Sequence, residues 1–139
     1  MEPHTIHPQL LADCHPLGEL VASDLLLHRN ASLHWFVVVP RTTVPDLLDL
    51  PALERAQVIS DCGAVSSFLK GTLGYGKVNF AGLGNVVPQM HLHVIGRRPE
   101  DACWPSPVWG NLPEGPTWSI DAIETLRVGL TEKAGLRLR

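Results

Sequence analysis

The chain has 139 residues, of which 45% are hydrophobic and 18% are charged, and its net charge is −3 with the seven histidines neutral. This length suits one domain, and the apolar content excludes a disordered chain. No run approaches the ~20 apolar residues of a membrane helix, and the start of the chain lacks the basic and apolar regions of a signal peptide. No stripe of Lys and Arg indicates a nucleic-acid partner. We therefore expect residues 1–139 to form a single cytoplasmic domain with no nucleic-acid or membrane partner.

The cysteines do not suggest a disulfide framework. Cys14, Cys62 and Cys103 are odd in number and far apart, and no Cys-x-x-Cys pair occurs, so a structural zinc site is not indicated either. Cys62 lies on the apolar face of an expected helix and is interpreted as a core thiol. A cysteine nucleophile paired with a distant histidine is a minor alternative.

The first third of the chain predicts a short helix and then strands. We expect the helix from His7-Pro8 to Cys14 and short strands over residues 18–23 and 24–28. Residues 35–39 are apolar and mostly β-branched, which is typical of a central strand buried on both faces. Pro40 is expected to end this strand.

A long helix is expected next. It begins near Pro51, where a missing N–H group costs little, and ends at Gly71 or Gly74. Its expected apolar face follows three- and four-residue steps through Ile59, Cys62, Val65 and Phe68/Leu69. Strands are expected over residues 75–79 and 89–96, on either side of a Gly-rich bend.

The last forty residues divide into an irregular arm and a helix. Five prolines and three tryptophans between residues 99 and 118 exclude a strand inside a sheet. A helix capped by Ser119 or Asp121 follows, with Ile120, Ile123, Leu126 and Leu130 on one face. Because no β-α-β alternation repeats, the element order predicts an α+β domain with an antiparallel sheet.

The most informative segment is Gln89-Met90-His91-Leu92-His93-Val94-Ile95. On a strand, alternate side chains share a face, so Gln89, His91 and His93 are expected to face a cleft together. Imidazoles two residues apart are about 6.5–7 Å apart and are able to address one phosphate or one metal ion.

Three interpretations of this pair are open. The first is a half-exposed strand whose histidines have no function. The second is a metal site, which requires a third ligand such as His34 or Asp101. The third is nucleophilic catalysis, in which an imidazole oriented by a second group attacks phosphorus.

The residues before the histidines favour a bound anion. The segment Asn79-Phe80-Ala81-Gly82-Leu83-Gly84-Asn85 combines two glycines with two asparagines. Glycines allow backbone N–H groups to approach an anion closely, and asparagine amides bind phosphate or ribose oxygens. Alone the segment is an ordinary turn, but before His91 and His93 it forms a plausible phosphate cradle.

Residues 79–97 resemble the active-site region of the histidine-triad (HIT) family of nucleotide hydrolases and transferases, whose motif is His-φ-His-φ-His-φ-φ after a Gly-rich loop. Residues 85–93, followed by Trp104-Pro105-Ser106-Pro107-Val108-Trp109-Gly110, look like a bacterial branch of that family. The resemblance covers residues 18–112 and leaves the C-terminal arm and helix, 113–139, outside it. It implies a five-stranded antiparallel sheet with one long helix and a C-terminal helix, and pairing into a homodimer with a continuous ten-stranded sheet.

The resemblance also implies the chemistry. His91 matches the nucleophile, which attacks the α-phosphorus of a nucleoside phosphoramidate or dinucleoside polyphosphate to form a nucleotidyl-histidine intermediate. His93 matches the third histidine of the motif, which binds phosphate oxygens, and no metal or other cofactor is implied. The remaining expected site residues are the catalytic position Gln89 and the substrate-binding positions Asn79, Gly84, Asn85 and Asn30.

Three positions depart from the family pattern. Gln89 replaces the first histidine and is unable to accept a proton at neutral pH. Trp35 stands where many members have a histidine, and the adjacent His34 is expected on the opposite face of the strand. Val86 replaces a frequent hydroxyl residue. A purine-nucleotide-binding module with little or no turnover is therefore the alternative function.

Overall fold

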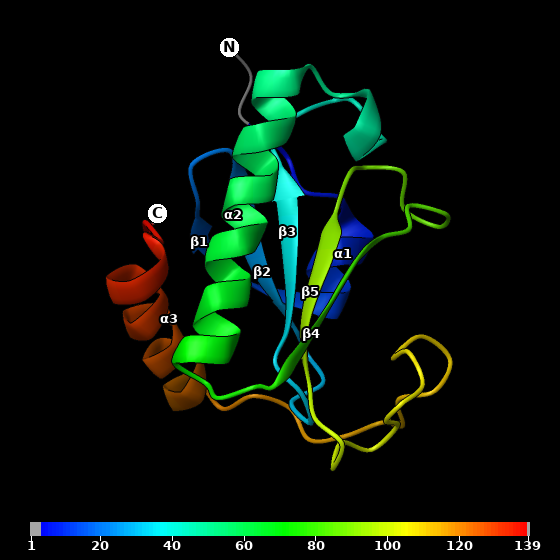
Figure 1. Cartoon of the computed structure of the whole chain (residues 1–139), viewed down its shortest axis with the longest axis vertical. Helices are drawn as coiled ribbons and strands as arrows, with labels where there is room; N and C mark the ends of the chain where they lie inside the picture. Colours follow the sequence, from blue (N-terminus) through cyan, green and yellow to red (C-terminus); the bar gives the residue numbers. More distant parts are fainter. Residues whose placement is uncertain (1–3, 139) are drawn as a thin grey trace.

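The computed structural model describes residues 4–138 and is built on a five-stranded antiparallel sheet with the strand order β1-β2-β3-β5-β4. Figure 1 shows the long helix α2 lying across one face of the sheet, while the short helix α1 lies behind it on the other face. The α+β class and the five-stranded antiparallel sheet predicted above are confirmed.

The first strands differ in their bounds from those expected. Helix α1 spans Pro8–Asp13, β1 spans Cys14–Glu19, β2 spans Ser23–His28 and β3 spans Trp35–Pro40. The strand expected over residues 18–23 is wrong, because residues 20–22 form the turn between β1 and β2. All six residues of β3 are buried, as expected for a central strand.

The second half of the chain keeps the expected order of elements. A 3-10 turn, η1, spans Leu47–Asp49; α2 spans Ala52–Gly71, β4 spans Lys77–Gly82, β5 spans Leu92–Arg97, and α3 spans Ile120–Ala134 with Ser119 as its N-cap. Strand β4 starts two residues later than expected and β5 starts three residues later, at Leu92 rather than Gln89. This delay in β5 changes the direction of the Gln89 side chain, as described below.

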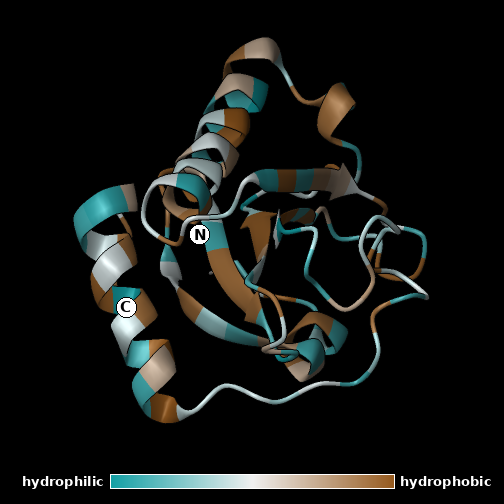
Figure 2. Ribbon diagram, turned by 60° about the horizontal axis from the view of Figure 1, so that its bottom comes forward, coloured by the Kyte–Doolittle hydropathy of each residue, from teal (hydrophilic) through white to brown (hydrophobic). Residues whose placement is uncertain are grey.

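Two apolar clusters cover the two faces of the sheet. Helices α2 and α3 pack on the side of Phe36, Leu92 and Val94, and α1 packs with the arm on the side of Trp35 and Ile95. Figure 2 shows hydrophilic and hydrophobic segments alternating along both long helices. Cys62 lies in the first cluster, as expected.

The helix faces contain two errors of prediction. Ile59 is 44% exposed, and Val58 is buried in its place. Ile120, the first residue of α3, is 80% exposed, and the buried face of this helix begins at Ile123.

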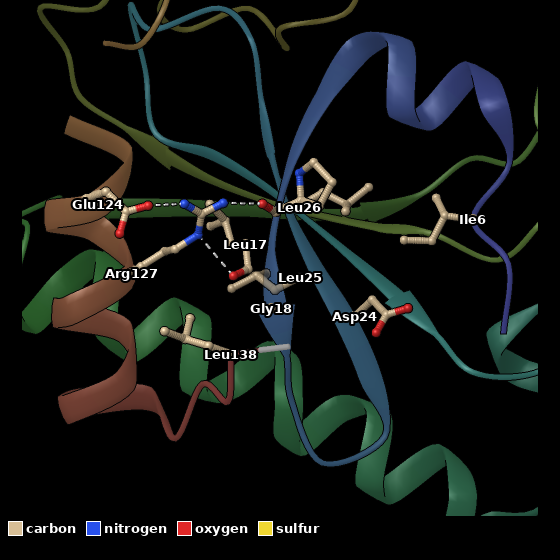
Figure 3. Close-up of a pocket in the computed structure, with 10 residues that line it drawn as sticks. Ile6, Leu17, Gly18, Asp24, Leu25, Leu26, Glu124, Arg127 and Leu138 are labelled. Carbon is tan, nitrogen blue, oxygen red and sulfur yellow. Dashed lines mark hydrogen bonds and ion pairs between the residues drawn. The ribbon is translucent and has the colours of Figure 1, made fainter. Parts of the chain in front are cut away.

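Helix α3 is attached to the edge strand β1 by one arginine. The Arg127 guanidinium donates to the carbonyls of Leu17 and Pro16 and forms an ion pair with Glu124 on its own helix, as Figure 3 shows. A hollow of about 320 Å³ opens beside this contact. None of its ten lining residues is a histidine, so it lies apart from the candidate catalytic groups.

The arm of residues 99–118 is attached to the end of β5 by a buried ion pair. Arg97 donates through Nε to Asp101 at 2.8 Å, and its remaining N–H groups bond to Asn79 and to the carbonyl of Ser106. Burial alone would raise the pKa of Asp101, but hydrogen bonds from Arg97 and from the backbone N–H groups of Arg98 and Cys103 lower that pKa to about 2.

Within residues 4–138, no helix has the length and apolar character required to cross a membrane.

The ion pair predicts a loss of stability in acid. Because the pKa of Asp101 is lower in the folded chain, its contribution is complete above the ordinary value of 3.8 and is lost as pH falls toward 2. Asp101→Asn is expected to reduce the free energy of unfolding at pH 7 by about 3 kcal/mol, because Arg97 then lacks its buried partner. Denaturant titrations between pH 7 and pH 2.5 measure both effects.

Glu124→Gln is the matched control. It removes a carboxylate from the ion pair with Arg127, in which the glutamate side chain is 57% exposed, so it is expected to change stability by less than about 1 kcal/mol. Equal losses in the two variants would contradict the importance assigned to the buried pair.

Candidate functional site

Two imidazoles lie together at the start of β5. His93 is the second residue of this strand and His91 immediately precedes it. Their ring centroids are 5.1 Å apart with an interplanar angle of 72°. Both residues are buried, with 9% and 7% of their surface exposed. The structure therefore brings together the two histidines that the motif singled out.

His91 is oriented by the backbone of its own segment. Its Nδ1 atom lies 2.8 Å from the carbonyl oxygen of Gln89. Since a carbonyl oxygen only accepts, Nδ1 carries the proton, and the Nε2 atom of the neutral ring has a free lone pair. Within residues 4–138 this Nε2 atom has no hydrogen-bond partner.

His93 is oriented by a tryptophan. The Nε1–H group of Trp35 donates to Nδ1 of His93 at 3.0 Å. Burial, followed by the neighbouring His91 and His28, lowers the pKa of His93 to about 4. His93 is therefore a neutral ring at physiological pH.

The two histidines line a cavity of about 440 Å³ on the α1 face of the sheet. Its walls combine apolar and aromatic side chains with a few polar groups, a composition typical of small-molecule sites. The lining residues are Gln9, Leu10, Asp13, Cys14, His28, Trp35, Val37, Leu83, Gly84, Asn85, Val86, Val87, His91, His93 and Trp109. His91 and Gly84 also line an adjacent hollow of about 450 Å³ between η1 and β4.

The loop between β4 and β5 supplies backbone donors at the cavity. Gly84 has a φ of 69°, which favours glycine. Within residues 4–138, the backbone N–H groups of Gly84 and Asn85 donate no hydrogen bond. Both residues line the cavity, and backbone N–H groups without a partner are suited to binding an anion.

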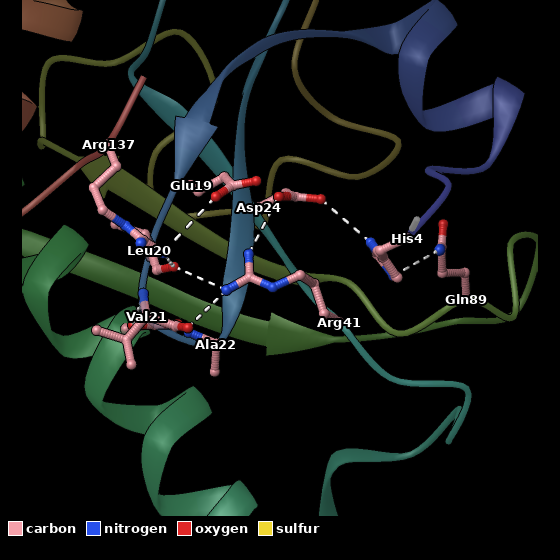
Figure 4. Close-up of polar contacts among 10 residues, drawn as sticks. His4, Glu19, Leu20, Val21, Ala22, Asp24, Arg41, Gln89 and Arg137 are labelled. Atoms are coloured by element: carbon pink, nitrogen blue, oxygen red, sulfur yellow. Dashed lines mark hydrogen bonds and ion pairs between the residues drawn. The ribbon is translucent and has the colours of Figure 1, made fainter. Parts of the chain in front are cut away.

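Gln89 does not share a face with the histidines. Its side-chain oxygen accepts from the backbone N–H of His7 at 2.8 Å, and its amide nitrogen donates to the carbonyl of Thr5 at 2.8 Å. Figure 4 shows the same amide beside His4, whose ring also contacts Asp24. Because β5 begins only at Leu92, the alternation does not extend to Gln89, whose side chain fastens the N-terminal segment instead.

The expected substrate-binding residues separate into two groups. Gly84 and Asn85 line the cavity. Asn79 accepts a hydrogen bond from Arg97 at 2.9 Å, and Asn30 bonds to Ser32 and to the carbonyl of Pro113, so neither lines the cavity. In the structure these two amides stabilise the arm.

Several lining residues escaped the sequence analysis. His28 stacks on Trp35 with centroids 4.0 Å apart and an interplanar angle of 8°. The register that pairs Leu27 with Phe36 places His28 opposite Trp35. Pairing residues 23–28 with residues 35–40 as a hairpin would therefore have predicted this contact from the sequence. The contribution of α1 through Leu10 and Asp13 had no such signal, because it depends on long-range packing.

The donors considered for a metal ion lie apart. The ring of His34 faces the α2 side, where its Nδ1 atom lies 2.7 Å from the Tyr75 hydroxyl, and Asp101 is paired with Arg97. Among the described residues, no group of three His, Cys, Asp or Glu side chains is placed to bind a metal ion. His34 and Asp101 therefore do not complete a ligand set with His91 and His93.

Cys14 and Cys62 have the properties of core thiols. Burial raises the pKa of both Cys14 and Cys62 to about 12. Since the thiolate is the nucleophile, neither is activated for attack.

Loss of the Gln89 amide is expected to loosen the N-terminal segment. Gln89→Ala removes the acceptor for the His7 N–H group, and the exchange of this amide hydrogen is expected to accelerate about fivefold, the value of one hydrogen bond of about 1 kcal/mol. Hydrogen exchange followed by NMR measures the rate. The control Gln57→Ala changes an exposed glutamine on α2, and it should leave the His7 rate unchanged. An unaltered rate in Gln89→Ala would contradict the fastening role.

Comparison with known proteins agrees with this geometry. The family model described as HIT domain matches residues 11–100. A histidine triad protein from Bradyrhizobium japonicum is 34% identical, with a TM-score of 0.86 over 94% of this chain and 97% of that one. A histidine triad protein from Marinobacter aquaeolei is 33% identical, with a TM-score of 0.86 over 95% and 96% of the two chains.

A third such protein, from Sinorhizobium meliloti, is 30% identical, with a TM-score of 0.87 over 94% of this chain and 96% of that one. Among curated proteins no match was found. The family model and the solved structures agree, and the chain belongs to the histidine-triad (HIT) family.

Proposed function

We propose that this protein hydrolyses or transfers the nucleotidyl group of a nucleoside phosphoramidate or dinucleoside polyphosphate through His91. The observation that carries the proposal is the contact of His91 Nδ1 with the Gln89 carbonyl, which leaves the Nε2 lone pair free beside the cavity. Membership of the HIT family supports a nucleotide hydrolase or transferase in general terms.

The cavity offers distinct surfaces for the parts of a nucleotide. The backbone N–H groups of Gly84 and Asn85 are donors for phosphate oxygens. The rings of His28 and Trp109, which are only partly buried, form an aromatic wall against which a base can pack. In this proposal a nucleotide binds with its base toward these rings and its phosphate toward His91.

The proposed reaction has two displacements at phosphorus. With a phosphoramidate, the bond from Nε2 of His91 to phosphorus forms and the P–N bond breaks, and the departing amine takes a proton from solvent. The imidazolium that results keeps its Nδ1–H bond to the Gln89 carbonyl. Water then attacks phosphorus, the P–Nε2 bond breaks, and a proton returns to solvent, which regenerates neutral His91 and releases a nucleoside monophosphate.

We also propose that two copies of the chain pair through β4. Among residues 4–138 this strand is an edge of the sheet, so one row of its backbone groups has no strand partner in the described part of the chain. Phe80 on β4 and Leu83 just after it are each 48% exposed. Antiparallel pairing of two such edges would join the sheets of two copies.

Replacement of His91 tests the nucleophile. His91→Ala is expected to lower the turnover of adenosine phosphoramidate or diadenosine polyphosphate by about 10³-fold or more, because no other group replaces the attacking nitrogen. Rapid quench in denaturant at alkaline pH, where the P–N bond survives, followed by mass spectrometry should detect the nucleotidyl adduct on His91.

His15→Ala is the matched control, since His15 lies on the edge strand β1 and does not line the cavity. It is expected to retain activity. Unchanged turnover in His91→Ala would overturn the nucleophile assignment. AMP or GMP binding in calorimetry, without hydrolysis or adduct, would instead favour a nucleotide-binding module.

Light scattering tests the dimer. The native chain is expected at twice its mass of 15.2 kDa at micromolar concentration. Phe80→Lys should shift the protein toward the monomer, because it places a charge on the proposed contact. A native protein that scatters only as a monomer would contradict this pairing.

A further inference from the structure

The contact between Trp35 and His93 determines which nitrogen of His93 carries the proton. An indole N–H group only donates hydrogen bonds. Since Nε1 of Trp35 lies 3.0 Å from Nδ1 of His93 in a buried contact, Nδ1 acts as the acceptor. The proton of the neutral ring is therefore on Nε2.

We propose that Trp35 is a positioning residue that holds His93 in the Nε2–H tautomer, so that His93 presents an N–H donor to the phosphoryl oxygens of the nucleotide. The catalytic part of this inference rests on the proposed function; the tautomer itself does not. Within residues 4–138, Nε2 of His93 has no hydrogen-bond partner, which leaves it available at the cavity.

The surroundings of Trp35 keep its indole ring in place. One face of the ring stacks on His28, with centroids 4.0 Å apart and an interplanar angle of 8°. Trp109 meets the indole edge-to-face at a centroid distance of 5.9 Å. With only 7% of its surface exposed, Trp35 has little room for another rotamer.

The two histidines then offer opposite groups to the cavity. His91, whose Nδ1 faces a carbonyl, offers a lone pair on Nε2. His93, whose Nδ1 faces an N–H group, offers a proton on Nε2. A nucleophile beside a hydrogen-bond donor is the combination that attack on a phosphoryl group requires, because negative charge increases on the phosphoryl oxygens as the new bond forms.

The alternative tautomer of His93 would be unfavourable at both ring nitrogens. A proton on Nδ1 would oppose the N–H group of Trp35 across 3.0 Å, donor against donor. The lone pair then left on Nε2 would face the phosphoryl oxygens and repel them. The indole N–H therefore favours the one tautomer that is able to stabilise the transition state.

NMR of ¹⁵N-labelled protein tests the tautomer without any substrate. Correlation of the ring protons with both imidazole nitrogens should show His93 protonated at Nε2 and unprotonated at Nδ1. A scalar coupling across the hydrogen bond should join Nε1 of Trp35 to Nδ1 of His93. A proton on Nδ1, or no coupling, would overturn the assignment.

Trp35→Phe tests the consequence for activity. It keeps an aromatic ring in place and removes the N–H donor. We expect the Nδ1 resonance of His93 to lose its hydrogen-bonded position, the Nδ1–H tautomer to become populated, and kcat to fall by about 10–100-fold with a smaller change in KM. A fall in kcat with an unchanged His93 spectrum would overturn the positioning role, and an altered spectrum with unchanged kcat would overturn its catalytic value.

Trp109→Phe is the matched control for the spectrum. Trp109 contacts His93 edge-to-face at 5.0 Å, but within residues 4–138 its indole nitrogen donates no hydrogen bond. This variant should leave the His93 tautomer unchanged, and a shift equal to that of Trp35→Phe would overturn the specific role of the Trp35 N–H group. If the wild-type protein turns over no nucleotide, the proposed function fails, while the tautomer still stands or falls on its own spectrum.

Discussion

The site depends on the register with which β5 pairs with β3. This pairing sets Val37 opposite His93 and Trp35 opposite Ile95, so Trp35 and His93 share one face of the sheet. Phe36 and Val94, the pair between them, bury themselves against α2 on the other face. A slip of one residue in β5 would turn His93 toward α2 and Val94 toward the cavity. The burial of β3 and β5 on both faces therefore fixes the position of the imidazole as well as the core.

The sequence predicted the parts of the fold that depend on local pattern. The apolar run before Pro40 predicts β3, because a strand buried on both faces has no polar positions. The steps from Cys62 to Leu69 predict α2, although the pattern placed Ile59 on the buried face where Val58 lies. The alternating pattern wrongly predicts that the strand begins at Gln89. A strand begins only where its backbone pairs with a neighbouring strand. The β4 pairing ends at Gly82 opposite Leu92, so Gln89 lies outside the pleat.

Apart from Gly84, Asn85 and the two histidines, most of the cavity wall was beyond sequence reasoning for a different reason. The Gln89 amide meets backbone groups more than eighty residues earlier in the chain, and Trp109 reaches Trp35 and His93 from the irregular arm. Such contacts depend on how an arm without repeating hydrogen bonds folds back over the sheet, and no periodicity records that path. The role of Trp35 was also not predictable from the sequence. The family pattern identifies it as the loss of a histidine, whereas the structure identifies it as a hydrogen-bond donor to another histidine.

The described lining of the cavity has no cationic side chain, so an anion bound there depends on neutral N–H groups. Among the described residues that line the cavity there is neither Lys nor Arg, and Asp13 contributes a carboxylate. A phosphate bound there would be stabilised by N–H dipoles from the loop and from His93, since burial keeps His93 uncharged. Dipoles stabilise an anion only when they point toward it, and in a buried site they do so without reorganising during the reaction. The direction of each N–H bond therefore matters more here than net charge, and at His93 that direction depends on the indole of Trp35.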